Sequence, residues 1–140
     1  MIILGVDFGD TRTGLAVCDK SEMIASRAGC IQGGFKKALE GTANVAREQR
    51  AELIVVGNPI NMNGTEGPRS AKCRDFAAEL EALTGIKTVL YDERLTTVTA
   101  HSFLTMSGVD SRQHKKHVDE LSARLILEDY MKLRKNKGEI

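Results

Sequence analysis

Apolar runs separated by short polar breaks dominate the first part of the chain. Residues 2–8 are apolar apart from Gly5 and Asp7, residues 15–18 are apolar after a polar turn, and a weaker run begins at Met23 and continues toward Ile31. Three such runs joined by short turns predict an antiparallel meander of three strands. The first strand has apolar side chains at both odd and even positions, which is typical of a central strand covered on both faces.

After residue 34 the apolar positions change to helical spacing. This spacing predicts helices over 35–49, 68–84 and about 114–133, with a shorter helix over about 96–104. Pro68 suits a first helical turn, and Gly85 is typical of the residue after a helix end. Short apolar runs at 53–56 and 87–91 predict two buried strands, and the segment 58–68 is predicted to be a loop.

Strands that are joined through helices usually lie parallel, whereas the meander is antiparallel. The fold class is therefore predicted to be α/β, with a mixed five-stranded sheet and helices on both faces. We find no internal repeat, so we expect one domain over residues 1–140 that ends in a frayed basic tail from about residue 134.

Composition narrows the function classes. The net charge is +1, so nucleic-acid binding would need a local basic patch rather than a field from the whole molecule. Aromatic residues make up only 4% of the chain, which argues against a surface that stacks single-stranded bases. The three cysteines are not at metal-ligand spacing, and there is no signal peptide or membrane-spanning run, so we expect a cytoplasmic protein that does not bind membranes.

Asp7 is the most informative residue of the first strand. An ionised carboxylate within an apolar run needs a cation, several hydrogen-bond donors or a raised pKa, because removing it from water is costly. Gly9 and Gly14 follow it in the chain, and their lack of side chains would let a ligand or backbone approach closely.

Two further acids are placed to join Asp7. Glu93 follows the strand 87–91, and the carboxyl ends of parallel strands form the ligand-binding edge of an open α/β sheet. Asp119 shares a helix face with Ala123 and Ile126, so it is predicted to lean toward the sheet. Oxygen ligands without histidine favour Mg²⁺ or Mn²⁺, and such a cluster is typical of phosphoryl transfer. Considered singly, Asp119 could instead have a structural role, because a negative charge near a helix N-terminus is stabilised by the helix dipole. Glu93 could likewise form a surface ion pair with Arg94.

Basic and polar residues flank these acids. The candidates for contacting a phosphate backbone are Arg12, Arg94, Lys115 and Lys116, together with Asn61 and Thr65 in the predicted loop. The spacing of His114 and His117 invites a zinc interpretation, but no cysteine pair or third ligand accompanies them, so a phosphate contact or proton shuttle is favoured.

Four motifs in order resemble the YqgF family, whose members are described as pre-16S rRNA nucleases or Holliday junction resolvases. The motifs are Gly5-Val6-Asp7-Phe8-Gly9-Asp10-Thr11-Arg12-Thr13-Gly14-Leu15-Ala16, Gly57-Asn58-Pro59-Ile60-Asn61-Met62-Asn63-Gly64-Thr65, Asp92-Glu93-Arg94-Leu95-Thr96-Thr97 and Val118-Asp119-Glu120-Leu121-Ser122-Ala123. The resemblance implies a ribonuclease H-like fold and a divalent-metal nuclease with Asp7, Glu93 and Asp119 as its acidic centre. It also implies a role in trimming the 5′ end of the pre-16S rRNA, on free RNA or in a ribosomal particle, with cleavage of branched DNA as the alternative.

Two other functions stay open at this stage. A strand with an Asp and a glycine-rich hairpin also begins the nucleotide-binding halves of actin- and hexokinase-like proteins, although those need two halves and this chain has no repeat. A non-catalytic ribosome-assembly factor is the second alternative. It is favoured by Ser122, which stands where related resolvases carry a further acid.

Overall fold

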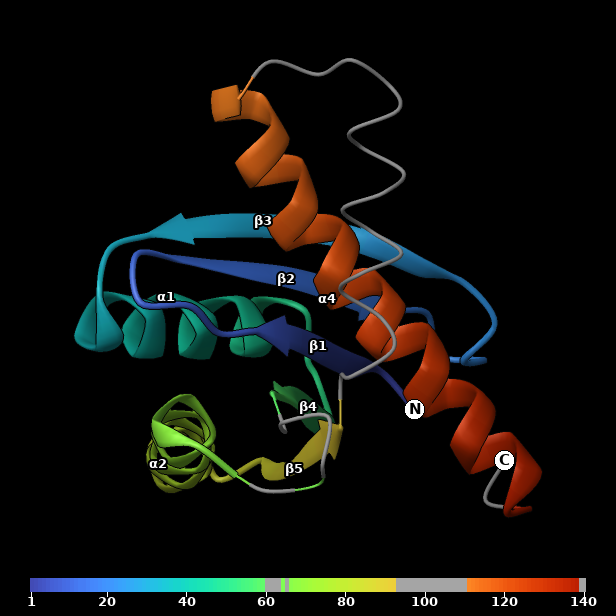
Figure 1. Cartoon of the computed structure of the whole chain (residues 1–140). Coiled ribbons are helices and arrows are strands. Elements are labelled where there is room, and N and C mark those ends of the chain that lie inside the picture. The colour runs from blue at the N-terminus through green and yellow to red at the C-terminus, as the bar shows by residue number, and fades with distance from the viewer. Residues whose placement is uncertain (60–63, 65, 93–110, 139–140) are drawn as a thin grey trace.

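The fold is a five-stranded mixed sheet, seen in a computed structural model that describes residues 1–59, 64, 66–92 and 111–138, with 111–119 described by their backbone alone. The strand order is β3-β2-β1-β4-β5 (Figure 1). β1, β2 and β3 pair antiparallel, while β1, β4 and β5 pair parallel. The strands are β1 (Ile3–Asp7), β2 (Arg12–Cys18), β3 (Ala25–Gln32), β4 (Leu53–Asn58) and β5 (Lys87–Asp92). The predicted mixed sheet of five strands is confirmed.

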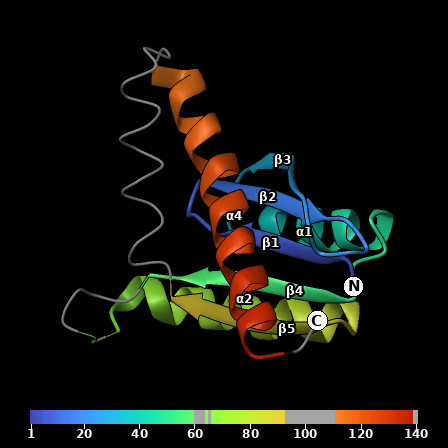
Figure 2. The same cartoon turned by 90° about the vertical axis from the view of Figure 1, so that its right-hand side faces the viewer.

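Helices cover both faces of this sheet, as the sequence predicts. α1 (Phe35–Glu48) and α2 (Pro68–Thr84) pack on one face, and α4 (Ser111–Asn136) crosses the other face obliquely (Figure 2). Leu4 and Val6 of β1 face α1 and α2, whereas Ile3 belongs to the core beneath α4. β1 is therefore a central strand buried on both sides, which confirms the interpretation of its apolar pattern.

Local signals set the ends of α2. Pro68 occupies the first turn, where its missing N–H leaves no hydrogen bond unmade. Gly85 ends the helix in the left-handed conformation, with φ of 72°. In the described part of the chain, no helix has the length and apolar character needed to cross a membrane.

Other boundaries differ from the prediction. β2 begins at Arg12 rather than at residue 15, because the polar residues 12–14 pair with β3 and Gly14 also pairs with Asp7. α4 runs from Ser111 to Asn136, longer at both ends than the predicted 114–133. Its last turn is held by Arg134, which donates to Glu22 near the start of β1, so the helix continues beyond Leu133. The helix expected over 96–104 lies outside the described residues.

Candidate active site

Asp7 is the last residue of β1 and therefore lies at the carboxyl edge of the parallel part of the sheet. Side chains alternate along a strand, so Asp7 shares the α4 face with Ile3 and Gly5. Its partner across the antiparallel ladder is Gly14, which has no side chain to occupy the neighbouring space. The half-buried Asp7 therefore has no side chain opposite it on β2.

α4 comes unusually close to β1 at Gly5. A Cβ atom built on Gly5 would lie 2.9 Å from both the Ala123 carbonyl oxygen and the Leu127 Cβ. The end of α4 lies near the start of β1, because Arg134 contacts Glu22 and Glu22 contacts the Met1 amino group.

The direction of α4 places the backbone of Asp119. This residue precedes Ala123 by one helical turn, so it lies on the side of Gly5 that faces away from Arg134. That side is the carboxyl end of β1, where Asp7 lies. The backbone therefore carries Asp119 toward the end of the sheet where Asp7 lies, and the expected lean of the Asp119 side chain toward the sheet stays a prediction.

The third predicted acid follows directly on β5. Asn58 of β4 is in register with Asp92 of β5, so both parallel strands end at one edge, and Glu93 is the next residue in the chain. Glu93, Arg94, Asn61 and Thr65 lie outside the described residues. Lys115 and Lys116 lie in the first turns of α4, where only the backbone is described.

A metal cluster is not apparent from the described side chains alone. Within residues 1–59, 64, 66–92 and 120–138, no three histidine, cysteine or acidic side chains come together. Of the three predicted ligands, only Asp7 has a described side chain. Asp7, Glu93 and Asp119 therefore stay a predicted ligand set.

Arg12 is on the same face as Asp7. Arg12 precedes Gly14 by two residues along β2, so both lie on one face of the sheet. Gly14 is directly opposite Asp7 on that face. The Arg12 guanidinium donates to the Thr11 hydroxyl over 3.4 Å at the surface. The contact between Arg12 and substrate stays a prediction.

The structure adds Arg27, which sequence reasoning missed. Its strand β3 pairs with β2 so that Arg27 is in register with Ala16, on the α4 face. The exposed guanidinium lies 3.9 Å from the buried Glu120 carboxylate of α4. No local signal marks Arg27, because its placement depends on the irregular register between Leu15 and Ala16.

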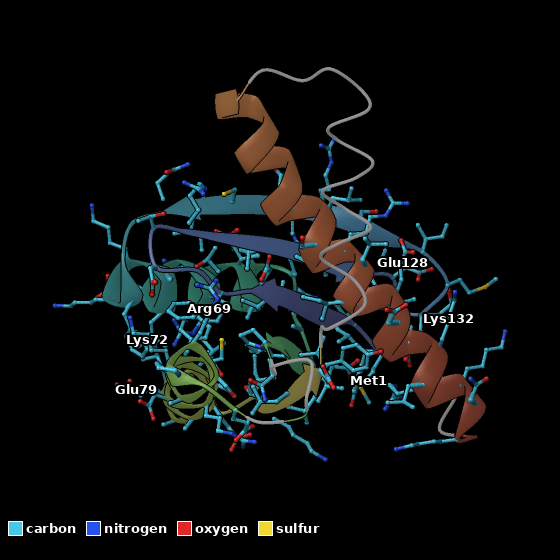
Figure 3. The ribbon with its side chains drawn as sticks, viewed as in Figure 1. Met1, Arg69, Lys72, Glu79, Glu128 and Lys132 are labelled. Carbon is cyan, nitrogen blue, oxygen red and sulfur yellow. The ribbon has the colours of Figure 1, made fainter. Side chains whose placement is uncertain are left out.

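Two basic residues of α2 hold the turn that follows Asp7. The Arg69 guanidinium donates to the Phe8 carbonyl oxygen over 3.0 Å, and the Lys72 amine donates to Asp10 over 3.2 Å. Both side chains extend from the start of α2 toward this turn (Figure 3). Gly9 is required here, since a Cβ would lie 2.4 Å from the Arg12 carbonyl oxygen. These cations therefore stabilise the loop beside Asp7.

A buried polar network fixes the end of β4. Asn58 is 3% exposed, and its amide oxygen accepts a 2.6 Å hydrogen bond from the Ser70 hydroxyl. Its amide nitrogen donates to Glu66, which is also paired with Arg74. Hydrogen bonds from Arg74 and then Asn58 hold the pKa of Glu66 below its ordinary value. The network ties the start of the predicted loop to the first turns of α2.

Comparison with known proteins identifies the family. A family model described as "RuvX: Holliday junction resolvase" matches residues 1–133. The chain belongs to the RuvX family. Two relatives are each named "Putative pre-16S rRNA nuclease". One, from Carboxydothermus hydrogenoformans, is 40% identical over 94% of this chain and 96% of its own. The other, from Thermoanaerobacter pseudethanolicus, is 40% identical over 98% and 100%. These matches confirm the resemblance seen in the four motifs.

Solved structures confirm the fold of this RuvX-family chain. Thermus thermophilus RuvC is 14% identical, covers 97% of both chains and has a TM-score of 0.59. The same protein in complex with a Holliday junction substrate is 13% identical, covers 96% of both chains and has a TM-score of 0.60. The fold is ribonuclease H-like.

Proposed function

We propose that this RuvX-family chain is a single-domain nuclease that uses a divalent metal to hydrolyse phosphodiester bonds in the 5′ region of pre-16S rRNA. The observation that carries the proposal is Asp7, a half-buried carboxylate at the carboxyl edge of the sheet, on the α4 face and opposite Gly14. Ligands bind at this edge in open α/β sheets. The matched relatives support the nuclease class and the RNA substrate, and an rRNA precursor as substrate would place the protein in the cytoplasm.

The residues proposed to hold the metal are Asp7, Glu93 and Asp119. Carboxylate oxygens suit Mg²⁺ or Mn²⁺. The position of Asp7 at the end of β1 and the backbone course of α4 support such a site. A metal held there would polarise the phosphate and lower the pKa of the attacking water.

The chain's own cations would bind and orient the substrate. Arg12 and Arg27 lie on the α4 face with Asp7, and cationic side chains of this kind bind phosphate oxygens. We propose that further backbone contacts come from the segments on either side of the acids, namely from Asn61, Thr65, Arg94, Lys115 and Lys116. Because the net charge is only +1, this local patch would account for most of the salt dependence of binding.

The substrate is tested by comparing cleavage rates of the wild-type protein. The protein is incubated with equal concentrations of three substrates, each with Mg²⁺, with Mn²⁺ or with EDTA. The substrates are an RNA with the pre-16S 5′ extension, an RNA with the mature 16S 5′ end, and a four-way DNA junction. The proposal predicts metal-dependent cleavage of the precursor in preference to the other two. Preferred cleavage of the junction would instead assign the resolvase activity that the family description names.

One observation favours a non-catalytic assembly factor as second candidate. Ser122 is fully buried one turn after Asp119, and its hydroxyl has no hydrogen-bond partner in the structure as described. A carboxylate at this position could have supplied a further metal ligand. If this candidate were correct, the precursor RNA would be bound equally well with metal or EDTA and would not be cut under any of these conditions.

A further inference from the structure

The hairpin between β2 and β3 presents two large apolar side chains to solvent. Met23 is 79% exposed and Ile24 is 65% exposed, more than any other large apolar residue in the described ranges. Burying an apolar side chain stabilises a fold, so leaving two adjacent ones in water forgoes that stabilisation. The exposure of Met23 and Ile24 is therefore not explained by the stability of the fold.

Hydrogen bonds hold the hairpin in this outward conformation. The Asp19 carboxylate accepts from the Ser21 hydroxyl and from the backbone N–H groups of Met23 and Ile24, at 2.9 and 3.2 Å for the two N–H groups. These bonds, with Ser21 the largest contributor, lower the pKa of Asp19 to about 2. Glu22 adopts the left-handed conformation, with φ of 57°. The exposed pair is therefore presented by an ordered turn.

A groove of about 430 Å³ lies between this hairpin and the last turns of α4. Its apolar part comprises Met23, Ile24, Ala25 and the buried Met131, and its polar rim comes from α4. Glu128 and Lys132 extend from the half of α4 that lies beside the hairpin (Figure 3). The groove is thus concave, with an apolar wall and a charged rim.

The uncompensated charge on the rim is positive. Arg134 and the Met1 amino group neutralise Glu22, and Arg124 donates to Glu128 over 2.8 Å. Lys132 and Lys135 also line the groove, and neither forms an ion pair within 4.0 Å with an acid among residues 1–59, 66–92 and 120–138. Lys132 also lies near Asp129, where its charge opposes the rise that burial causes in the pKa of that carboxyl. Because neither lysine is held in such an ion pair, both charges can still meet an incoming acid beside the apolar wall.

We propose that this groove docks an acidic peptide segment of a partner protein, with aliphatic side chains against Met23 and Ile24 and carboxylates beside Lys132 and Lys135. A nucleic acid would leave the apolar wall unused, and a flat lipid surface would leave the concave groove unfilled. The groove lies by the amino end of β1, whereas Asp7 lies at its carboxyl end. Docking would therefore leave the proposed active site open.

The test begins with selection of short random peptides displayed on phage against the wild-type chain, counter-selected against the Met23→Ser/Ile24→Ser variant. The proposal predicts enriched peptides with aliphatic residues flanked by Asp or Glu. A synthetic peptide of the enriched sequence should then bind wild type and lose at least about tenfold in affinity with Met23→Ser/Ile24→Ser or with Lys132→Glu/Lys135→Glu. Replacing its acids by lysine should restore binding to the lysine-to-glutamate variant.

Matched controls separate docking from folding. Leu83→Ser removes an exposed apolar side chain on α2, and Lys137→Glu reverses a charge beyond the groove. Both should bind the peptide as wild type does, and all variants should retain the wild-type Tm within a few degrees. The proposal is overturned if no enriched peptide depends on Met23 and Ile24, or if the enriched peptides are basic. It is also overturned if Met23 and Ile24 contribute only to the binding of RNA, of phosphatidylserine vesicles or of a second copy of the chain.

Discussion

Gly5 of β1 and Leu127 of α4 are in such close contact that a Cβ atom at Gly5 would lie 2.9 Å from the Leu127 Cβ. The same Cβ would meet the Ala123 carbonyl oxygen at 2.9 Å, so the helix backbone as well as a side chain limits this position. The absence of a side chain at Gly5 therefore sets the distance between α4 and the sheet. Because Asp119 lies one turn from Ala123, this contact also controls where the proposed site can form.

Gly5→Ala should destabilise the fold by about 1–3 kcal/mol, since an added atom in a filled interface forces the helix outward. Urea unfolding followed by circular dichroism measures this difference. Gly34→Ala is a suitable control, because the nearest atom to its new Cβ is 3.8 Å away, and it should cost less than Gly5→Ala. A Gly5→Ala variant as stable as wild type would show that α4 can move without cost.

Ser70→Ala should cost about 1–3 kcal/mol, because it leaves the buried Asn58 amide oxygen without its donor. Adding Asn58→Leu to Ser70→Ala should recover part of that loss, since two apolar groups no longer require a hydrogen bond. Unfolding free energies of both single variants and the double variant complete the cycle. Strictly additive losses would exclude direct coupling between these side chains.

Glu22→Gln should destabilise the fold at neutral pH by about 1–3 kcal/mol, because Arg134 is mostly buried and would lose its charged partner. Burial alone would raise the pKa of Glu22, but hydrogen bonds and charge from Arg134 and the Met1 amino group outweigh it and hold the pKa below the ordinary value of 4.5. A lowered carboxyl pKa stabilises the fold above that ordinary value, and the stabilisation is lost as pH falls through the folded-state pKa.

The difference in unfolding free energy between wild type and Glu22→Gln should therefore be constant from neutral pH to about pH 5 and shrink at lower pH. Urea titrations at several pH values give this profile. A difference that grew on acidification would mean that the Glu22 pKa is raised rather than lowered.

Asp19 should titrate with a pKa of about 2 in a carbon-detected NMR titration of the side-chain carboxyls. The Ser21 hydroxyl is the largest cause of this low value, followed by the N–H groups of Met23 and Ile24. Ser21→Ala should therefore raise the pKa of Asp19 while Lys20→Ala, a neighbouring change without this hydrogen bond, should not. An ordinary pKa in the wild-type chain would contradict the ordered hairpin.

The sheet and most helices could be predicted because their signals are local. Apolar residues on both sides of β1 reveal a central strand, and Pro68 and Gly85 set the ends of α2 by their own backbone preferences. Asp7 could be singled out for the same reason, since a carboxylate within an apolar run is visible without the fold. Glu93, Asn61, Thr65 and Arg94 stay predictions.

What the sequence could not provide depends on contacts between distant segments. The end of α4 required the pairing of Arg134 with Glu22, which are 112 residues apart. Arg69 and Lys72 follow the predicted loop in the sequence, but only the packing of α2 on the turn after β1 shows that they hold Phe8 and Asp10. Arg27 reaches the α4 face through a strand register that no periodicity reveals.

The central claim is that Asp7 is a metal ligand in a nuclease site, and one comparison of two carboxylates tests it most directly. Asp10 lies three residues later, is exposed and is paired with Lys72, so Asp10→Asn is the matched control for Asp7→Asn. The measurement is the single-turnover rate of precursor-RNA cleavage with Mg²⁺. The account predicts a loss of at least about a hundredfold for Asp7→Asn, since a bound metal supplies several kcal/mol of transition-state stabilisation, and a near wild-type rate for Asp10→Asn. Cleavage by Asp7→Asn at the wild-type rate would contradict the account.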